Sequence, residues 1–390
     1  MKKKMTYVSL FSSAGVGCFG FKQAGFECIA TNELIKRRLD VQRFNKKCKY
    51  KSGYICGDIT KDETKQFLFD EISLWKEKEN ISEVDVVIAT PPCQGMSVAN
   101  HKKTDNEIVR NSLVVESIKI INEIKPRFFV FENVPLFLKT ICTDVDKVDK
   151  PIADAIEKNL GCDYKYVGEV INFKNYGSNS SRKRTLVIGV RKDIECNPKD
   201  LFPDYTSEKT LRETIGHLMS LTKPYQFDPN DAYHFFRGYP DRMRRWISST
   251  PEGCSAFDNP NIEDRPHQVK DGKIVENVKK NSDKYTRLRW DSVGPCIHTR
   301  NDQLASQNTI HPSDDRVFSI RELMILMTIP ESFKWSEQSL DELNLLTNEE
   351  KRAYLKKEEI KIRQSIGEAV PTTIFEQIAK KIKKWNQNQN

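Results

Sequence analysis

The chain has 390 residues, of which 38% are hydrophobic and 30% are charged, and this mixture is typical of a globular protein and excludes disorder throughout. Its 63 basic and 55 acidic side chains give a net charge of +8, which suits a polyanionic partner without requiring one. The longest apolar runs, 84–89 and 323–329, are too short to cross a membrane, and no secretory signal follows the basic residues 2–4, so we expect a cytoplasmic protein.

Short apolar segments alternate with longer segments of helical period from residue 7 to about residue 190. This alternation predicts βαβ units and an α/β fold with a mostly parallel sheet. One helix is expected over 113–124, where Pro126 would end it. The expected strands are 7–11, 28–31, 54–56, 84–90, 128–131, 167–171 and 185–190.

Beyond residue 190 the alternation gives way to a segment rich in proline, asparagine, aspartate and aromatic residues. Within it, residues 233–246 interleave arginines with aromatic side chains, as a surface that contacts phosphates and bases would. The alternative is an amphipathic helix with solvated arginines. Regular patterns return with expected helices over 319–329 and 372–385, and with a charged, solvated helix within 337–361.

Small and acidic residues follow the first three expected strands. The first strand runs into Phe11-Ser-Ser-Ala-Gly-Val-Gly, a small-residue turn that opens a helix and leaves backbone N–H groups facing a ligand. After the second strand, Glu33 could accept hydrogen bonds from a ribose, and after the third, Asp58 could bind an adenine amino group. Small turns are also common for structural reasons, but the three features together predict a site for an adenosine compound.

Two reactive groups follow the next two strands. The fourth strand ends in Pro91-Pro92-Cys93-Gln94, and the prolines fix the backbone that presents Cys93 at the edge of the sheet. Glu132 follows the apolar fifth strand, where burial would raise its pKa and let it act as an acid near neutral pH. A thiol beside a protonatable carboxyl suits nucleophilic addition to an electron-poor ring, although a cysteine at this position could also be a buried structural thiol.

The remaining titratable residues carry two further predictions. Arg182 and Arg184 alternate before the expected strand 185–190, so both could face one side and bind phosphate or support the site. None of the ten cysteines forms a Cys-x-x-Cys pair, and the six histidines do not cluster beside them, so we expect reduced thiols and no metal site.

In their order along the chain, these motifs resemble those of the cytosine-5 DNA methyltransferase family of prokaryotic restriction-modification systems. The resemblance rests on Phe11 to Gly20 with Ala24-Gly25-Phe26, Pro91 to Gln94, Glu132 to Val134, the arginine pair, Arg316 to Glu322, and Gly367 to Pro371. The chain departs from the family's usual residues at Ser13, Val16, Ser180 and Glu368. Ser13, Val16 and Ser180 remove no chemical group that the family's mechanism uses, and Glu368 affects only its own cofactor contact.

The resemblance implies a Rossmann-like methyltransferase fold that binds S-adenosylmethionine, with a smaller target-recognition domain. It implies that Cys93 attacks C6 of a cytosine flipped out of duplex DNA, that Glu132 holds and protonates N3, and that C5 takes the methyl group. Arg182 and Arg184 would steady the thiolate and the flipped nucleotide. The implied cofactor contacts are Phe11, Ser12, Ala14, Gly15, Glu33, Asp58, Ile59, Pro91, Ala369 and Val370, and the implied DNA contacts are Gln94, Arg237, Arg244 and Arg245.

The resemblance also implies domain roles and partners. Residues 1–195 would form the catalytic and cofactor-binding domain, 196–285 the target-recognition domain, and 286–390 a return segment whose last helix packs on the catalytic domain. Double-stranded DNA is the implied partner, with a restriction endonuclease acting separately, no membrane and a monomer as the sufficient state. Three alternatives stay open: a transfer RNA methyltransferase, a catalytically silent DNA-binding relative, and a nicotinamide-dependent oxidoreductase.

Overall fold

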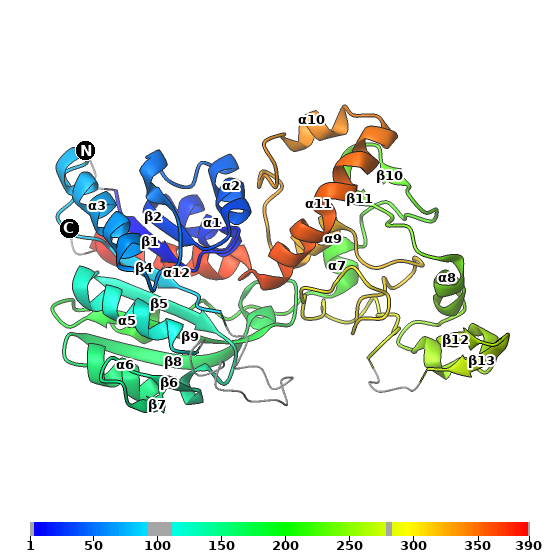
Figure 1. Ribbon diagram of the computed structural model, residues 1–390, viewed down its shortest axis with the longest axis horizontal. Coiled ribbons are helices and arrows are strands. Elements are labelled where there is room, and N and C mark those ends of the chain that lie inside the picture. The colour runs from blue at the N-terminus through cyan, green and yellow to red at the C-terminus, as the bar shows by residue number, and fades with distance from the viewer. Residues whose placement is uncertain (1–3, 93–110, 278–282, 389–390) are drawn as a thin grey trace. The chain divides into compact units, whose positions relative to one another are not determined.

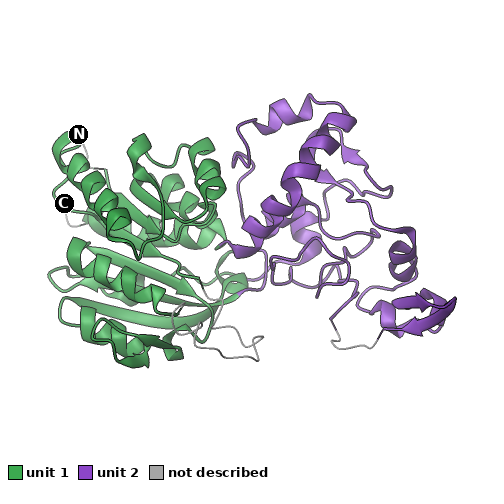
Figure 2. Cartoon of the chain, in the orientation of Figure 1, with its two compact units in different colours: residues 1–177, 183–206, 370–390 green, residues 178–182, 207–369 purple. Residues whose placement is uncertain are grey.

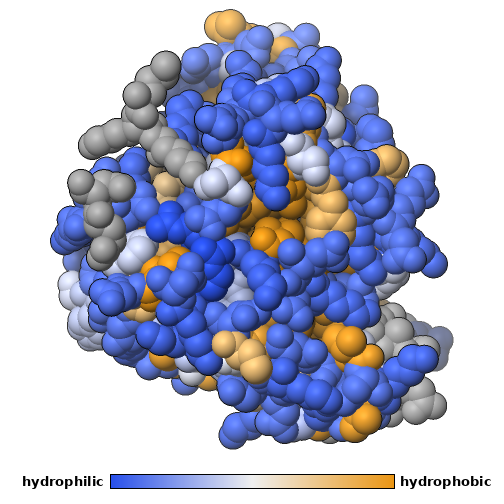
Figure 3. Space-filling view, turned by 90° about the vertical axis from the view of Figure 1, so that its left-hand side faces the viewer, coloured by the Kyte–Doolittle hydropathy of each residue, from blue (hydrophilic) through white to orange (hydrophobic). Residues whose placement is uncertain are grey.

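The computed structural model describes residues 4–92, 111–277 and 283–388. The chain forms two compact units, of which unit 1 comprises residues 1–177, 183–206 and 370–390, and unit 2 comprises 178–182 and 207–369 (Figure 2). No helix in the described part of the chain is long and apolar enough to span a bilayer. The surface at the left-hand side of Figure 1 is mainly hydrophilic with separate apolar areas (Figure 3), as the high fraction of charged residues leads one to expect.

Unit 1 is built on a seven-stranded sheet with the order β3-β2-β1-β4-β5-β9-β8 (Figure 1). Its first five strands in this order run parallel, and β9 is antiparallel to both β5 and β8. The sheet confirms the predicted α/β fold with a mostly parallel sheet. The strands are β1 (Thr6–Leu10), β2 (Glu27–Glu33), β3 (Tyr54–Cys56), β4 (Val86–Ala89), β5 (Phe128–Asn133), β8 (Tyr164–Asn172) and β9 (Lys183–Arg191).

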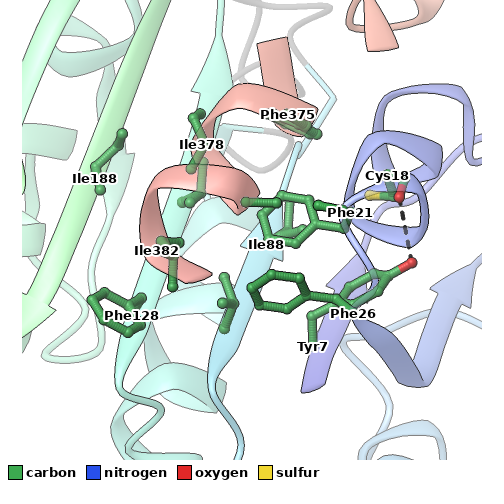
Figure 4. Close-up of a cluster of buried hydrophobic side chains, with 14 of the residues drawn as sticks. Tyr7, Cys18, Phe21, Phe26, Ile88, Phe128, Ile188, Phe375, Ile378 and Ile382 are labelled. Carbon is green, nitrogen blue, oxygen red and sulfur yellow. Dashed lines mark hydrogen bonds between the residues drawn. The ribbon is translucent and has the colours of Figure 1, made fainter. Parts of the chain in front are cut away.

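Helices cover both faces of this sheet. Successive residues of a strand point to opposite faces, so Tyr7 of β1 enters one apolar cluster and Val8 the other. The first cluster, drawn in Figure 4, includes side chains of α1 (Val16–Gln23), α2 (Lys36–Phe44) and α12 (Thr372–Asn388). The second includes side chains of α3 (Asp62–Lys78), α5 (Leu113–Ile124) and α6 (Ile152–Leu160), and a small hairpin of β6 (Ile141–Thr143) and β7 (Asp149–Pro151) completes the unit.

The last helix returns to unit 1 and packs on α1. Gly20 makes the close approach possible, because a Cβ atom there would lie 2.5 Å from both the carbonyl oxygen of Thr372 and the amide nitrogen of Glu376. On the same helix, Phe21 packs edge-on against Phe375, with ring centroids 6.1 Å apart. Helix α12 lies where the sequence predicts a final helix, and it contributes to the core that supports β1.

Apart from the 21-residue helix α11, unit 2 consists of short elements joined by long loops. Its helices and strands are α7 (Leu211–Ile215), β10 (Phe227–Asp228), β11 (Asp231–Phe235), α8 (Asp241–Ser248), β12 (His267–Lys270), β13 (Lys273–Glu276), α9 (Ile320–Leu326), α10 (Leu340–Asn344) and α11 (Asn348–Glu368). The segment 233–246 is therefore not one amphipathic helix, because Pro240 caps a separate helix after the end of β11.

The charged segment 337–361 also differs from the single solvated helix that we expect from the sequence. Ser339 and Thr347 each form a capping box and begin two separate helices, α10 and α11. Helix α11 buries charged side chains, among them Glu359 and Arg363, which bond to each other at 2.8 Å. A run of charged residues therefore contributes to the interior of unit 2.

A buried ionic network joins the loop before α9 to the start of that helix. The guanidinium group of Arg316 donates to Asp314 at 2.7 and 3.0 Å and to both carboxylate oxygens of Glu322 at 2.7 and 2.8 Å. His311 lies beside it, and its Nδ1 accepts the backbone N–H groups of Ser313 and Asp314. All the charged groups of this network are buried, so loss of any one of them would leave an uncompensated buried charge in the unit.

We expect acid to destabilise unit 2 through His311. Burial lowers the pKa of His311 to about 4, although the carboxylates of Glu322 and Asp314 oppose the shift. An unfolded histidine has a pKa of about 6.5, so between these two values the unfolded chain binds the proton more strongly. The free energy of unfolding should therefore fall by about 3 kcal/mol from pH 7 to pH 4 through this residue alone. Urea unfolding of the wild type and of His311→Gln at both pH values measures the difference, and an identical pH dependence of the two proteins would contradict the prediction.

Candidate active site

The turn after β1 has an unusual backbone conformation. Phe11, Ser13 and Gly15 have positive φ angles of 55°, 47° and 78°, and only glycine adopts this region without strain. The backbone N–H of Ser12 donates to the carbonyl of Asn32 at 3.1 Å, which joins the turn to the end of β2. Helix α1 then begins at Val16, so the predicted small-residue turn that opens a helix is present.

Glu33, the last residue of β2, is buried against this turn. Its Oε2 atom accepts the backbone N–H of Ser13 at 2.8 Å, and its Oε1 atom accepts that of Ile35 at 3.0 Å. The guanidinium group of Arg38 lies 3.5 Å from Oε1. A carboxylate offers about four acceptor positions, so Glu33 can hold the turn and still accept hydrogen bonds from hydroxyl groups of a ligand.

The ends of β2 and β3 meet beside Glu33. The amide of Asn32 donates to the carbonyl of Gly57 at 3.0 Å, just before Asp58. Asp58 is exposed, and hydrogen bonds from the backbone and hydroxyl of Thr60 lower its pKa, so it carries a negative charge at neutral pH. Leu34 and Ile35 expose apolar surface at the same edge, which we did not predict.

Pro91 ties the end of β4 to its neighbours. The amide of Asn133 donates to the carbonyl of Pro91 at 2.8 Å, and the hydroxyl of Thr90 donates to the carbonyl of Phe11 at 3.0 Å. Cys93 and Gln94 lie outside the described residues. The segment that leads to Cys93 is thus anchored to both β5 and the turn after β1.

Glu132 and Arg184 form a pair on neighbouring strands. The sequence pattern predicts that Glu132 follows the fifth strand. Strand β5 instead extends through Asn133, so Glu132 lies within it. Antiparallel pairing places Glu132 opposite Leu186 of β9, and the Nε atom of Arg184 lies 3.3 Å from its carboxylate. The role of Glu132 as an acid stays a prediction.

Arg182 does not follow the alternation expected from the sequence. Strand β9 begins at Lys183, and Arg182 belongs to unit 2, where its Nη1 atom donates to the carbonyls of Ile297 and Gly367 at 3.1 and 3.2 Å. The structure therefore pairs Arg184 with Glu132, while Arg182 bonds to one loop carbonyl and one carbonyl in the last turn of α11, both in unit 2.

The other candidate residues have the following surroundings. Ser12, Ala14, Gly15, Ile59, Ala369 and Val370 are buried, and Phe11 is partly buried. In unit 2, Arg237 bonds to Glu359 at 2.8 Å, Arg245 bonds to Asp264 at 2.6 Å, and Arg244 lies over the ring of Phe236. Their contacts with cofactor or DNA stay predictions. Within the described residues no group of three or more histidine, cysteine and acidic side chains could hold a metal ion.

Two buried residues next to the turn were not predicted at all. Gln42 of α2 donates from its amide to Ser12 and Ser13, and Lys47 donates to Gln42. Residues 36–47 contain so many charged and polar side chains that nothing distinguishes these two in the sequence. Only the packing of α2 against the sheet reveals them.

Comparisons with known proteins relate this chain to DNA methyltransferases. A sequence model described as C-5 cytosine-specific DNA methylase matches residues 5–384. The chain is 31% identical over 403 residues to the Type II methyltransferase M1.HgaI of Avibacterium volantium, with 100% of both chains covered. It is 26% identical over 414 residues to the Type II methyltransferase M.DdeI of Desulfomicrobium norvegicum, with 99% of this chain and 90% of that protein covered.

Among solved structures, a DNA modification methyltransferase encoded within a prophage of E. coli has a similar fold. The TM-score is 0.65 at 16% sequence identity, and the match covers 98% of this chain and 100% of the other.

Proposed function

Because this chain belongs to the C-5 cytosine-specific DNA methylase family, we propose that it transfers a methyl group from S-adenosylmethionine to C5 of cytosine at specific sites in duplex DNA. The observation that carries the proposal is the match to the family over residues 5–384, together with 31% identity to a Type II methyltransferase over the full length of both chains. Modification of host DNA in a restriction-modification system, with an endonuclease acting separately, is the corresponding biological role.

The residues at the edge of the sheet fit S-adenosylmethionine. Glu33 has acceptor capacity for ribose hydroxyls, and the ionised carboxylate of Asp58 can accept a hydrogen bond from the adenine amino group. Exposed Leu34 and Ile35 offer apolar surface for a planar ring, and Gly15 lets the backbone of the turn pack closely. When bound, the cofactor supplies an electrophilic methyl group.

The chain's own residues would prepare the cytosine for this transfer. The target base must leave the duplex, because its ring edge is inaccessible inside the stack. The thiolate of Cys93 would then add to C6 while Glu132 holds and protonates N3, which makes C5 nucleophilic. After methylation, loss of the C5 proton and elimination restore the Cys93 thiolate. Arg184 would hold the carboxyl of Glu132 in place.

Unit 2 would contribute to DNA recognition. Arg237 and Arg245 each have an acidic partner in the protein, which orients their guanidinium groups, and Arg244 stacks on an aromatic ring. Together with Gln94, these residues would contact base edges and phosphates. One active site for each flipped base makes a monomer sufficient, and the cytoplasm is where such an enzyme would meet host DNA.

The test is incubation of the protein with labelled S-adenosylmethionine and either unmethylated genomic DNA or transfer RNA, followed by bisulfite sequencing. We expect label in DNA and protected cytosines in one short sequence context. Label in transfer RNA alone would show that the substrate is transfer RNA and not DNA. Transfer to neither would support the catalytically silent relative.

Replacing Glu33 with alanine should weaken binding of S-adenosylmethionine. The substitution removes a charged acceptor for the ribose and the anchor of Ser13, and a hydrogen bond to a charged group contributes about 1.5 to 3 kcal/mol. Isothermal titration calorimetry measures the effect. Glu27→Ala at the opposite end of β2 is the matched control, since Glu27 pairs with Lys4. An unchanged affinity in Glu33→Ala would overturn the assignment of the ribose contact.

A further inference from the structure

The turn after β1 rests on the side chain of Gln42. The amide nitrogen Nε2 of Gln42 donates to the hydroxyl of Ser12 at 2.8 Å and to the carbonyl of Ser13 at 2.7 Å. A Cβ atom on Gly15 would lie only 2.8 Å from Cγ of Gln42, so the backbone of the turn packs directly on this side chain. The amide therefore contacts the part of the turn that has left-handed backbone angles.

The orientation of this amide is fixed from its other side. The oxygen Oε1 of Gln42 accepts a hydrogen bond from the hydroxyl of Thr31 at 2.8 Å and another from Nζ of Lys47 at 2.9 Å. Both hydrogens of the amide nitrogen and both acceptor positions of the oxygen are used. A flipped amide would place its NH₂ group against the ammonium of Lys47 and its oxygen against the carbonyl of Ser13, so only one orientation is compatible with this site.

Lys47 is the first donor of a chain of hydrogen bonds that runs in one direction. Its Nζ atom also donates to Thr31 at 2.9 Å, Thr31 donates to Gln42, Gln42 donates to Ser12, and Ser12 donates to the carbonyl of Asn32 at 3.1 Å. Within the described residues, no carboxylate lies within ion-pair distance of Lys47, which is only 8% exposed. Burying a lysine in this way is costly, and a gain at the turn would offset the cost.

We propose that Gln42 and Lys47 are positioning residues for S-adenosylmethionine. Lys47 orients the amide of Gln42, and that amide holds Ser12 and the left-handed Ser13 in the conformation that receives the cofactor. Residues held in left-handed backbone conformations persist only where their surroundings determine them. The proposal rests on the proposed function, since it assigns the turn to the cofactor, and it deepens that function by adding two residues that need not touch the ligand.

The proposal predicts a specific loss of cofactor affinity. Gln42→Leu should raise the Kd for S-adenosylmethionine about 10- to 100-fold, because it removes both donors to the turn. Lys47→Met should raise the Kd by a smaller factor, because the amide remains but can turn. The Kd for S-adenosylhomocysteine should rise in parallel. In turnover assays the KM for the cofactor should rise, while kcat at saturating cofactor stays within about threefold of wild type.

A double-mutant cycle tests whether Lys47 acts through Gln42. In the Gln42→Leu background, Lys47→Met should change the Kd no further, because its partner is already lost. Additive effects would overturn the chain from Lys47 to Gln42. Tyr164→Phe is the matched control, since it also removes one buried hydrogen bond in unit 1, to the carbonyl of Pro126, and it should leave the Kd unchanged.

Calorimetry on the full chain distinguishes failure of the proposed function from failure of this inference. If the wild type does not bind S-adenosylmethionine, the proposed function fails. If the wild type binds and the folded Gln42→Leu and Lys47→Met variants bind equally well, the present inference fails. Should Gln42→Leu not fold, Thr31→Val removes one hydrogen bond to the same amide with little change of shape, and an unchanged Kd in that variant would overturn the inference too.

Discussion

Replacing Cys93 with serine is expected to abolish methyl transfer and to leave binding of S-adenosylmethionine near the wild-type level. A thiolate is a strong nucleophile at neutral pH, whereas a serine hydroxyl without a neighbouring base is not ionised there. Loss of the nucleophile that forms the covalent intermediate should lower the rate by roughly 10⁴-fold or more. Transfer of labelled methyl groups to DNA in a single turnover measures this rate.

A second readout shows whether the sulfur forms the bond to DNA. DNA that carries 5-fluorocytosine at the target should trap the wild-type protein, because fluorine at C5 cannot leave as the proton does and the bond to C6 persists. The adduct should survive denaturation in the wild type and be absent in Cys93→Ser. Cys162→Ser is the matched control, because Cys162 is a free thiol exposed on a turn after α6. Turnover that persists in Cys93→Ser would remove Cys93 from its proposed role.

The sheet of unit 1 was predictable because its strands are short, apolar and separated by amphipathic helices. Helix α5 has the bounds expected from the spacing of its apolar residues, and β3 has those expected from its sequence. The strands were less accurate at their ends, since hydrogen bonding to neighbours decides where a strand stops. Strand β5 continues through Glu132 and Asn133 because β9 pairs with both residues.

Unit 2 was less predictable, because its interior depends on ionic groups and loops. Arg316 and Glu322 are buried together, although neither residue type is usually found inside a protein. For the same reason, the many charged residues of segment 337–361 indicate a solvated helix from sequence alone. Glu359 of this segment pairs with Arg237, 122 residues earlier in the chain, and this contact becomes visible only in the folded structure.

Some residues of the candidate site could be predicted from the sequence and others could not. Glu33 and Asp58 could be predicted because each follows a strand, and the carboxyl ends of parallel strands meet at one edge. Gln42 and Lys47 could not, because a helix and a loop bring them to the turn from outside any motif. For Arg182 the structure adds what the sequence does not show, since β9 begins one residue later and Arg182 bonds to carbonyls of unit 2.

Replacing Glu132 with glutamine is expected to lower the rate of methyl transfer by about 10²- to 10⁴-fold, the range that a positioned general acid contributes. Glutamine keeps the length of the side chain and an oxygen that can accept from Arg184, so the local geometry should persist while the acidic proton is lost. The single-turnover rate at saturating DNA and cofactor measures the effect, and the Kd for S-adenosylmethionine should not change.

Two further variants distinguish the role of Glu132 from that of Arg184. Glu157→Gln is the control, since Glu157 lies on helix α6 of the same unit and accepts a hydrogen bond from Tyr166 at 2.9 Å. Arg184→Met should lower the rate by a smaller factor than Glu132→Gln, because the carboxyl remains and only its orientation is lost. A wild-type rate in Glu132→Gln would exclude proton donation by Glu132. A larger loss in Arg184→Met than in Glu132→Gln would show that the guanidinium group does more than orient Glu132, and would make direct contact with the flipped nucleotide its main role.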